Sequence, residues 1–264
     1  GTPKITLETG TTDRSVNYSS GSESDTLVFN YTVQNGDVAS DLDYTGTTAL
    51  ALNGGTIKDI AGNAATLTLK AVGATGSLGN AKALVVDGAL PTISTVAANA
   101  GTKTITLTMS ENVSGSPANG DFSVLVGSAS NAVTNVAISS KSVVLTVTNF
   151  IANDATVTVG YTQSSSDSAK MKDTAGNAVA TLSSAKSVTV TNDSTLPTVS
   201  SVTSSTSDGT FKVGDTVAVQ VKFSEAVVVT TAGGTPKITL ETGTTDRSVN
   251  YTSGSDSDTL VFNY

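Results

Sequence analysis

The heptapeptide Lys103-Thr104-Ile105-Thr106-Leu107-Thr108-Met109 predicts the fold of the region around it. Apolar and polar residues alternate along it, so Ile105, Leu107 and Met109 lie on one face of a strand and the threonines lie on the other. A strand with one apolar face needs a second layer to cover that face. The heptapeptide therefore predicts a strand of a β-sandwich with the apolar side chains inside.

The same alternation recurs through residues 91–196, broken by Gly, Asn, Asp and Ser. It predicts seven strands: Thr92–Val96, Thr102–Ser110, Phe122–Val126, Ala132–Ser139, Ser142–Thr148, Ala155–Tyr161 and Ala185–Thr191. Seven short strands in about 100 residues, without a helical pattern, are typical of an immunoglobulin-like sandwich. We call this region type B and predict that it is a complete domain.

Two stretches of the form Asp-x-x-Leu-Pro-Thr-(Ile/Val) flank type B, at 87–93 and at 193–199. Proline fixes its own φ and holds the preceding residue extended, which suits a stiff passage into a first strand. These stretches therefore predict domain boundaries after residue 90 and after residue 196.

A long repeat surrounds this region. Residues 1–31 and 234–264 align without a gap at an offset of 233 residues, and only two pairs differ, Ser19 with Thr252 and Glu23 with Asp256. Near-identity at a fixed period is typical of an array. We predict two domain types that alternate in a 233-residue period, with 1–90 as the C-terminal part of a type A domain and 197–264 as the N-terminal part of the next. On this interpretation the chain is one period of a longer protein, begun at an arbitrary phase.

The type A parts predict further strands, so the fold class expected for the chain is all-β, with tandem immunoglobulin-like sandwiches. The predicted strands are Val199–Val202, Thr216–Phe223, Lys237–Glu241, Ser248–Tyr251, Thr259–Tyr264, Thr48–Leu52, Thr66–Leu69 and Ala83–Val86. Each part of type A lacks strands of its own domain and would expose strand edges and half a core. We expect a neighbouring copy of the chain or repeat to complete it, or the polypeptide to continue in both directions. Domain swapping is the low-cost route if the chain ends there.

Composition excludes several classes of function. The chain has no His and no Cys, so a Ser-His-Asp triad, a Cys-His pair and thiolate or imidazole metal sites are impossible. A net charge of −8 argues against a nucleic-acid partner, because phosphates require patches of Lys and Arg. No apolar run approaches the roughly 18 residues of a membrane span. An acidic surface with few bases suits calcium or a saline exterior, or is a means of solubility.

Three carboxylates are predicted to meet at the first joint, the boundary between the first type A part and type B near residue 90. Glu111 ends the second predicted strand of type B, Asp173 lies in the loop before the last strand, and Asp87 lies in the linker that enters the domain. In a Greek-key sandwich all three positions belong to the N-terminal pole. Hard cations prefer several oxygen ligands, and clustered carboxylates repel one another without a cation. The pattern therefore predicts a calcium site.

The same arrangement recurs at the next joint with Asp193 and Glu225, and Asp59 is the corresponding loop carboxylate in the other type A copy. An alternative remains open. The motif Asp-x-Ala-Gly-Asn at 59–63 and 173–177 is also a turn, in which Asp and Asn bond their own backbone and Gly takes a positive φ. The two glutamates are then solvated residues at strand ends.

Several of these motifs resemble a known family. Phe211–Val217, the Phe-Ser-Glu element at 223–225, Leu52–Asn63 and the Asp-x-x-Leu-Pro-Thr linkers resemble bacterial Ig-like repeats of giant surface adhesins. Type B is similar to repeats of a cyanobacterial swimming-motility surface protein. The resemblance implies an extracellular, tandem, often calcium-stiffened extender that holds a ligand-binding tip away from the cell.

The function predicted from the sequence is a non-catalytic structural segment of an extracellular adhesin stalk or surface filament, rigidified by Ca²⁺ at the domain joints. It has no small-molecule substrate, and its partners are neighbouring copies. One alternative is a self-assembling surface-layer protein, and another is a carbohydrate-binding module. Paired carboxylates also suggest glycoside hydrolysis, but neither a cleft-forming insertion nor an aromatic sugar platform accompanies them.

Overall fold

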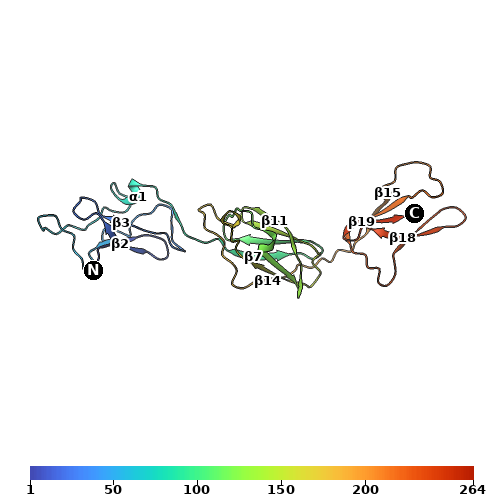
Figure 1. Cartoon of the computed structure of the whole chain (residues 1–264), viewed down its shortest axis with the longest axis horizontal. Coiled ribbons are helices and arrows are strands. Elements are labelled where there is room, and N and C mark those ends of the chain that lie inside the picture. Colours follow the sequence, from blue (N-terminus) through green and yellow to red (C-terminus); the bar gives the residue numbers. More distant parts are fainter.

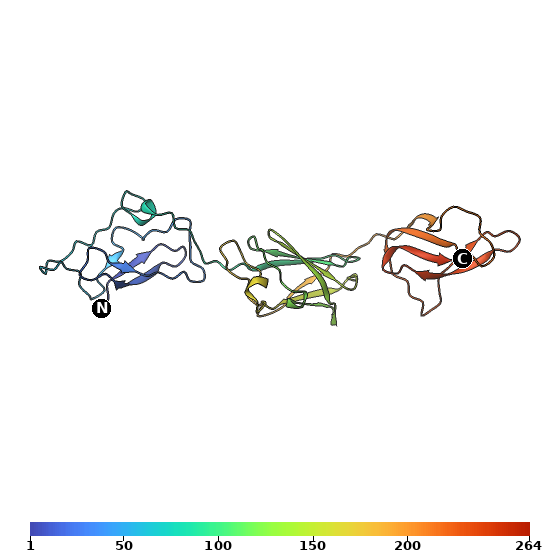
Figure 2. The same ribbon diagram turned by 45° about the horizontal axis from the view of Figure 1, so that its top comes forward.

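The computed structural model describes all residues, 1–264, as three bodies that follow one another along the long axis of the molecule (Figures 1 and 2). Each body has a hydrophobic cluster of its own, drawn from residues 7–86, 93–190 and 219–262 respectively. The structure is nearly all β, with several antiparallel sheets, which confirms the predicted all-β class. None of its helices has the length and apolar character needed to cross a membrane.

The middle body is a sandwich of two four-stranded antiparallel sheets, ordered β10-β9-β13-β14 and β11-β12-β8-β7. The strands are β7 (Ile93–Ala98), β8 (Thr104–Met109), β9 (Phe122–Val126), β10 (Ala129–Ser130), β11 (Val133–Ser139), β12 (Ser142–Val147), β13 (Thr156–Tyr161) and β14 (Lys186–Thr189), with two single-turn 3-10 helices, Asn119–Asp121 and Asp167–Ala169. All seven strands predicted from the alternation are present, and the pair of residues in β10 is added. Ile105, Leu107, Val143, Leu145 and Val157 are completely buried between the sheets, as the alternation in β8 predicted.

The first and last segments of the middle body run side by side in parallel. A parallel bridge joins Asn99 and Thr191. The backbone N–H of Ala100 donates to the carbonyl of Thr191 at 2.9 Å, and the N–H of Thr191 donates to the carbonyl of Ala98 at 3.0 Å. The chain therefore enters and leaves this body on neighbouring segments that are bonded to each other.

The first body contains a four-stranded sheet, ordered β3-β2-β1-β5, and a two-stranded sheet, β4-β6. Its elements are β1 (Lys4–Leu7), β2 (Arg14–Ser20), β3 (Val28–Phe29), β4 (Val38–Ala39), β5 (Leu50–Ala51), β6 (Val86–Asp87) and the one-turn helix α1 (Leu78–Ala81). The strand predicted at Thr66–Leu69 is wrong. That segment lies outside both sheets, and Leu69 N–H makes one backbone bond, to the carbonyl of Thr47 at 2.9 Å. Alternation alone does not make a strand where no neighbouring strand lies beside it.

The third body is one five-stranded antiparallel sheet, ordered β15-β16-β19-β18-β17. Its strands are β15 (Val199–Ser204), β16 (Ala218–Val227), β17 (Lys237–Leu240), β18 (Arg247–Ser253) and β19 (Ser257–Asn263). Each overlaps a strand predicted from the sequence. Its cluster has four buried members, Val219, Val249, Leu260 and Phe262, against 19 in the middle body, so its core is thin.

The two near-identical segments have different neighbours in the two outer bodies. Residues 26–31 and 259–264 are identical in sequence, yet β19 has seven residues and β3 has two. The difference arises because β19 pairs along β16, whereas β3 has a neighbour on one side only. At the other end of the meander the situation is reversed, since β1 pairs with β5 and β17 lies at the edge of its sheet.

Candidate metal centre

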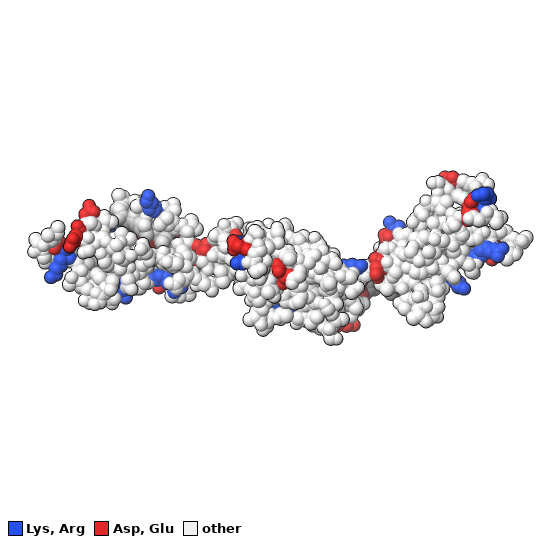
Figure 3. Space-filling model, viewed as in Figure 1, with Lys and Arg blue, Asp and Glu red and all other residues white.

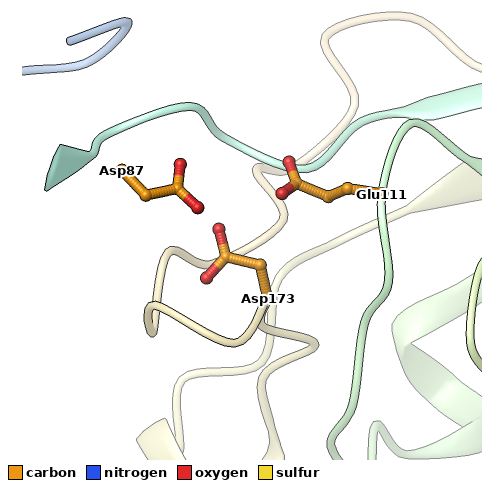
Figure 4. Close-up of side chains that lie close together, drawn as sticks. All are labelled: Asp87, Glu111 and Asp173. Carbon is orange, nitrogen blue, oxygen red and sulfur yellow. The ribbon is translucent and has the colours of Figure 1, made fainter. Parts of the chain in front are cut away.

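Three acidic side chains from separate parts of the chain meet at the joint between the first and middle bodies. Asp87 ends β6, Glu111 follows β8, and Asp173 lies in the loop between β13 and β14. Figure 4 shows their carboxylates pointing toward one another, and one oxygen of each lies within 4.8 Å of the others. The strand order brings these residues together in the way that the sequence predicted.

A tight turn holds Asp173 in place. Its Oδ1 accepts hydrogen bonds from the backbone N–H groups of Gly176 at 2.7 Å and Asn177 at 2.8 Å, and its Oδ2 accepts one from Asn177 Nδ2 at 2.8 Å. Gly176 has a φ of 98°, which glycine adopts without strain. The turn proposed as an alternative function of this motif is therefore present. It also aims the buried carboxylate at the joint, where Oδ2, which accepts one hydrogen bond, keeps a second lone pair for a further ligand.

Asn177 ties the same loop to the linker. Its Nδ2 donates to the main-chain carbonyl of Asp87 at 2.8 Å, a contact between residues 90 positions apart. The Asp87 carboxylate in turn accepts the backbone N–H of Ala89 at 3.2 Å. A groove of about 720 Å³ opens beside this contact and is lined by residues of both bodies, including Val33, Leu90 and Thr174. Sequence reasoning missed the role of Asn177, although the recurrence of Asn at the end of both motifs was the available signal.

The acids at this joint form no salt bridge, and Lys141 is the one basic side chain whose charge acts on Glu111. Burial raises the pKa of Glu111 above its ordinary value, the nearby charges of Asp173 and Asp87 raise it further, and Lys141 opposes the shift. None of the salt bridges in the structure includes these three acids. Asp and Glu side chains are visible at both joints on the face that Figure 3 shows.

The donor set fits a hard cation. All three side chains offer oxygen, the ligand that Ca²⁺ prefers, and oxygens bound to one Ca²⁺ lie at most about 5 Å apart. The 4.8 Å spread of the three carboxylate oxygens meets this limit.

At the second joint, between the middle and third bodies, the structure brings together two of the three predicted acids, Asp193 and Glu225. Burial raises the pKa of Glu225, with the Asp193 carboxylate as the next cause. The buried Oε1 of Glu225 has no hydrogen-bond partner, as expected for an acceptor that faces another carboxylate. Asp193 accepts the backbone N–H of Thr195 at 2.8 Å, and hydrogen bonds from Thr195 are the main cause that lowers its pKa.

Asp59 is separated from that pair. It lies in the first body, which the middle body separates from the joint that contains Asp193 and Glu225 (Figure 1). Its loop nevertheless repeats the turn described above: Asn63 donates its backbone N–H to Asp59 Oδ1 at 2.7 Å and its Nδ2 to Oδ2 at 2.8 Å. These hydrogen bonds lower the pKa of Asp59, whose side chain is exposed. Within residues 1–264, Asp193 and Glu225 therefore lie together and Asp59 lies apart from them.

Comparison with known proteins gives one match to a family and two to solved structures. Residues 112–166, inside the middle body, match the family described as "Putative flagellar system-associated repeat", in agreement with the similarity of type B to motility-associated repeats. No curated protein matches the chain. The N-terminal part of the bacterial S-layer protein SbsC is 16% identical over 51% of this chain, with a TM-score of 0.33. A longer form, rSbsC(31-844), is 20% identical over 66% of this chain, again with a TM-score of 0.33. The chain spans 41% and 23% of those two proteins, and scores this low carry no argument about fold or function.

Proposed function

We propose that the chain is a non-catalytic structural segment of an extracellular surface stalk or filament, with joints between domains that Ca²⁺ rigidifies. The observation that carries this proposal is the group Asp87, Glu111 and Asp173, because it draws one ligand from the linker and two from the next domain. An ion held by all three ties the linker to that domain and fixes the angle between neighbouring bodies. Without the ion, mutual repulsion of the carboxylates opens the joint.

The domain division that goes with this function is 1–90, 91–196 and 197–264. It is supported by the three separate hydrophobic clusters, none of which crosses a linker. The immunoglobulin-like type of the middle domain is supported by its two antiparallel sheets, since their strand order is that of an ABED sheet facing a sheet built around C, F and G.

The repetitive organisation is supported by the sequence. The match of residues 112–166 to a repeat family and the near-identity of 1–31 with 234–264 both favour a repetitive protein. Repeats that contact only their neighbours along one axis build long, thin molecules. The row of three bodies in Figures 1 and 2 has this form and suits an extender.

The experiment that tests the proposal is small-angle X-ray scattering of the chain with calcium and with EGTA, beside calorimetric titration of calcium. We expect calcium to bind and to narrow the distribution of interatomic distances at an unchanged maximum dimension, as bending at the joints stops. In Asp173→Ala, which removes one ligand and leaves both linker prolines, both effects are lost. Absence of calcium binding at millimolar concentration overturns the metal joint, and a compact, collapsed molecule in both conditions overturns the extender.

A further inference from the structure

Three Asn-Gly pairs occur in the chain, at 35–36, 53–54 and 119–120, and each asparagine is exposed. An asparagine before glycine is prone to lose its side-chain amide, because glycine has no Cβ to keep its backbone nitrogen away from the asparagine side chain. The reaction joins that nitrogen to Cγ of the asparagine in a ring. What the glycine nitrogen contacts therefore decides when each pair reacts.

At 35–36 the glycine nitrogen is bonded to the linker. Gly36 N–H donates to the carbonyl of Gly88 at 2.9 Å, and Gly88 N–H donates to the carbonyl of Asp37 at 2.7 Å. Gly88 follows β6 and belongs to the linker that leads into the middle body. We call residues 34–37 together with Gly88 the linker latch. The latch fastens the linker to the first body by two backbone hydrogen bonds.

The linker latch is a close fit. A Cβ on Gly88, which is buried, would lie 2.3 Å from the carbonyl oxygen of Gln34 and 3.1 Å from that of Asp37. The loop is held in place from behind, because the Asp37 carboxylate is 1% exposed and accepts Arg14 Nε at 2.7 Å and the Tyr31 hydroxyl at 2.6 Å. The closed latch therefore leaves little space for either segment to shift.

The other two pairs have surroundings that do not include a linker. The side-chain amide of Asn53 donates to the carbonyl of Thr2 at 3.2 Å. The side-chain amide of Asn119 donates to the carbonyl of Thr134 at 2.8 Å. These two pairs are internal references, since opening of the first joint changes neither contact.

We propose that Asn35 is a modification site that the linker latch protects: the closed latch prevents loss of its side-chain amide, and opening of the first joint permits it. In the closed latch the Gly36 N–H is directed at the Gly88 carbonyl, so the nitrogen neither gives its proton to solvent nor turns toward Cγ of Asn35. The reaction starts from the open form, and its rate follows the population of that form.

The reaction needs water as its one co-reactant. The Gly36 nitrogen gives its proton to solvent and attacks Cγ of Asn35. The bond from Cγ to the side-chain nitrogen breaks, and ammonia leaves with a proton taken from solvent. Water then opens the ring at one of its two carbonyls. Opening at Cγ gives an aspartyl residue, and opening at the main-chain carbonyl gives an isoaspartyl residue, in which the backbone runs through Cγ. Both products carry a carboxylate in place of the neutral amide.

The isoaspartyl product changes the first joint permanently. Asn35 lines the groove that Asp87 also lines, so the new carboxylate adds negative charge at the joint. The isoaspartyl residue also lengthens the backbone by one methylene before Gly36. This displaces the Gly36 N–H relative to Gly88, where the close fit leaves little space for adjustment. The isoaspartyl chain therefore does not close the latch, and a transient opening becomes a lasting one.

The first test follows loss of the amide at each Asn-Gly pair by peptide mapping and mass spectrometry, in mildly alkaline buffer with EGTA. Gly88→Ala should open the latch. We expect about tenfold faster loss at Asn35, which corresponds to about 1.4 kcal/mol in the opening equilibrium, and unchanged rates at Asn53 and Asn119. Gly46→Ala, in the same body, adds a Cβ that meets no atom beyond its chain neighbours within 4 Å. This matched control should leave all three rates as in the unaltered chain, and an equal rate at Asn35 in both variants overturns the proposal.

A comparison on the unaltered chain keeps the test decisive if Gly88→Ala unfolds the first body, which faster loss at Asn53 reveals. The chain is incubated folded and in urea. We expect Asn35 to lose its amide at least about tenfold more slowly in the folded chain, because the reaction needs the open latch. Equal rates at Asn35 in the two conditions show that the fold gives no protection and overturn the proposal.

The second test measures the joint after modification. In a chain with Asn53→Gln and Asn119→Gln the reaction is confined to Asn35, and anion exchange isolates the modified molecules by their added charge. Single-molecule energy transfer between dyes on the first and middle bodies should give a broader distance distribution for the isoaspartyl chain than for Asn35→Asp. That variant carries the same charge on a backbone of ordinary length, so equal widths overturn the lasting opening of the latch.

The proposal needs the linker latch and not a bound ion. Calcium that binds at the first joint should also slow the loss at Asn35, because it keeps the joint closed. A rate at Asn35 that rises in Gly88→Ala but does not respond to calcium supports the modification site and contradicts the calcium joint. The two proposals therefore fail separately.

Discussion

Replacing Glu111 by Gln removes one charge from the first joint while keeping the size of the side chain. Two unit charges 4.8 Å apart repel by about 0.9 kcal/mol in water. Physiological salt, with a screening length of about 8 Å, reduces this by roughly half. Glu111 faces two such charges, so Glu111→Gln should raise the free energy of unfolding by about 1 kcal/mol when no cation is present. For a domain of about 100 residues this corresponds to a melting midpoint higher by roughly 4–8 °C.

Calcium should reverse the order of the melting midpoints of the unaltered chain and of Glu111→Gln. An ion that binds only the folded state stabilises it by about 2.7 kcal/mol at 100 times its dissociation constant. The unaltered chain gains this stabilisation, whereas Glu111→Gln loses a charged ligand and gains little. In EGTA the variant should therefore melt above the unaltered chain, and in calcium it should melt below it.

The contribution of Glu111 to the free energy of unfolding should fall as the pH rises. The pKa of Glu111 is raised in the folded state, so the folded protein binds this proton more tightly than the unfolded chain does. In EGTA the free energy of unfolding of the unaltered chain, relative to Glu111→Gln, should fall as the pH rises from the ordinary pKa of Glu through the raised one. It should be constant above that range.

Differential scanning calorimetry measures all three effects on the transition of the middle body. Leu145→Ala identifies that transition, because Leu145 is completely buried in the core of this body and its loss lowers only that midpoint. A midpoint of Glu111→Gln below that of the unaltered chain in EGTA refutes the repulsion argument. An equal calcium shift in both proteins refutes the role of Glu111 as a ligand.

Three further outcomes follow from the same geometry. Asp173→Asn should abolish the calcium shift of the melting midpoint, whereas Asp59→Asn, in the matching turn of the first body, should leave it unchanged. Asn177→Ala removes the bond to the linker carbonyl and should widen the distance distribution between dyes placed on the first and middle bodies, measured by single-molecule energy transfer; an unchanged width contradicts a role in the joint. Leu107→Ala deletes a completely buried side chain and should lower the free energy of unfolding of the middle body by about 2–5 kcal/mol in urea titrations, with a smaller loss contradicting the sandwich core.

Sequence reasoning succeeded where local pattern and topology decide the result. Alternation along 103–109 was enough to place Ile105 and Leu107 in the core, because side chains on a strand point to opposite faces in turn. The convergence of Asp87 with Asp173 followed from strand order alone. The site was predictable to that extent because its acids lie at the ends of elements whose order is fixed.

Strand lengths, long-range contacts and the surroundings of the acids depend on which segments pack beside them, and the local sequence does not specify those segments. Identical residues form a long strand in β19 and a two-residue strand in β3, so no local property of 259–264 predicts its length. The bond from Asn177 to the linker carbonyl joins residues 90 positions apart, so the recurrence of Asn in the two motifs does not reveal its partner. The environment of Glu111, which sets its pKa, is likewise a product of packing.

The parallel contact between the two terminal segments of the middle body bears on how the molecule responds to tension. Force applied along the rod pulls the segment at Ala98–Ala100 and the segment at Thr191 in opposite directions, parallel to their own axes. The two hydrogen bonds between these segments, at 2.9 and 3.0 Å, lie across that direction and are loaded together in shear. Bonds sheared together resist more force than bonds peeled apart one at a time. The middle body, which has the largest core, therefore also has terminal segments joined by hydrogen bonds that are loaded in shear when the molecule is stretched.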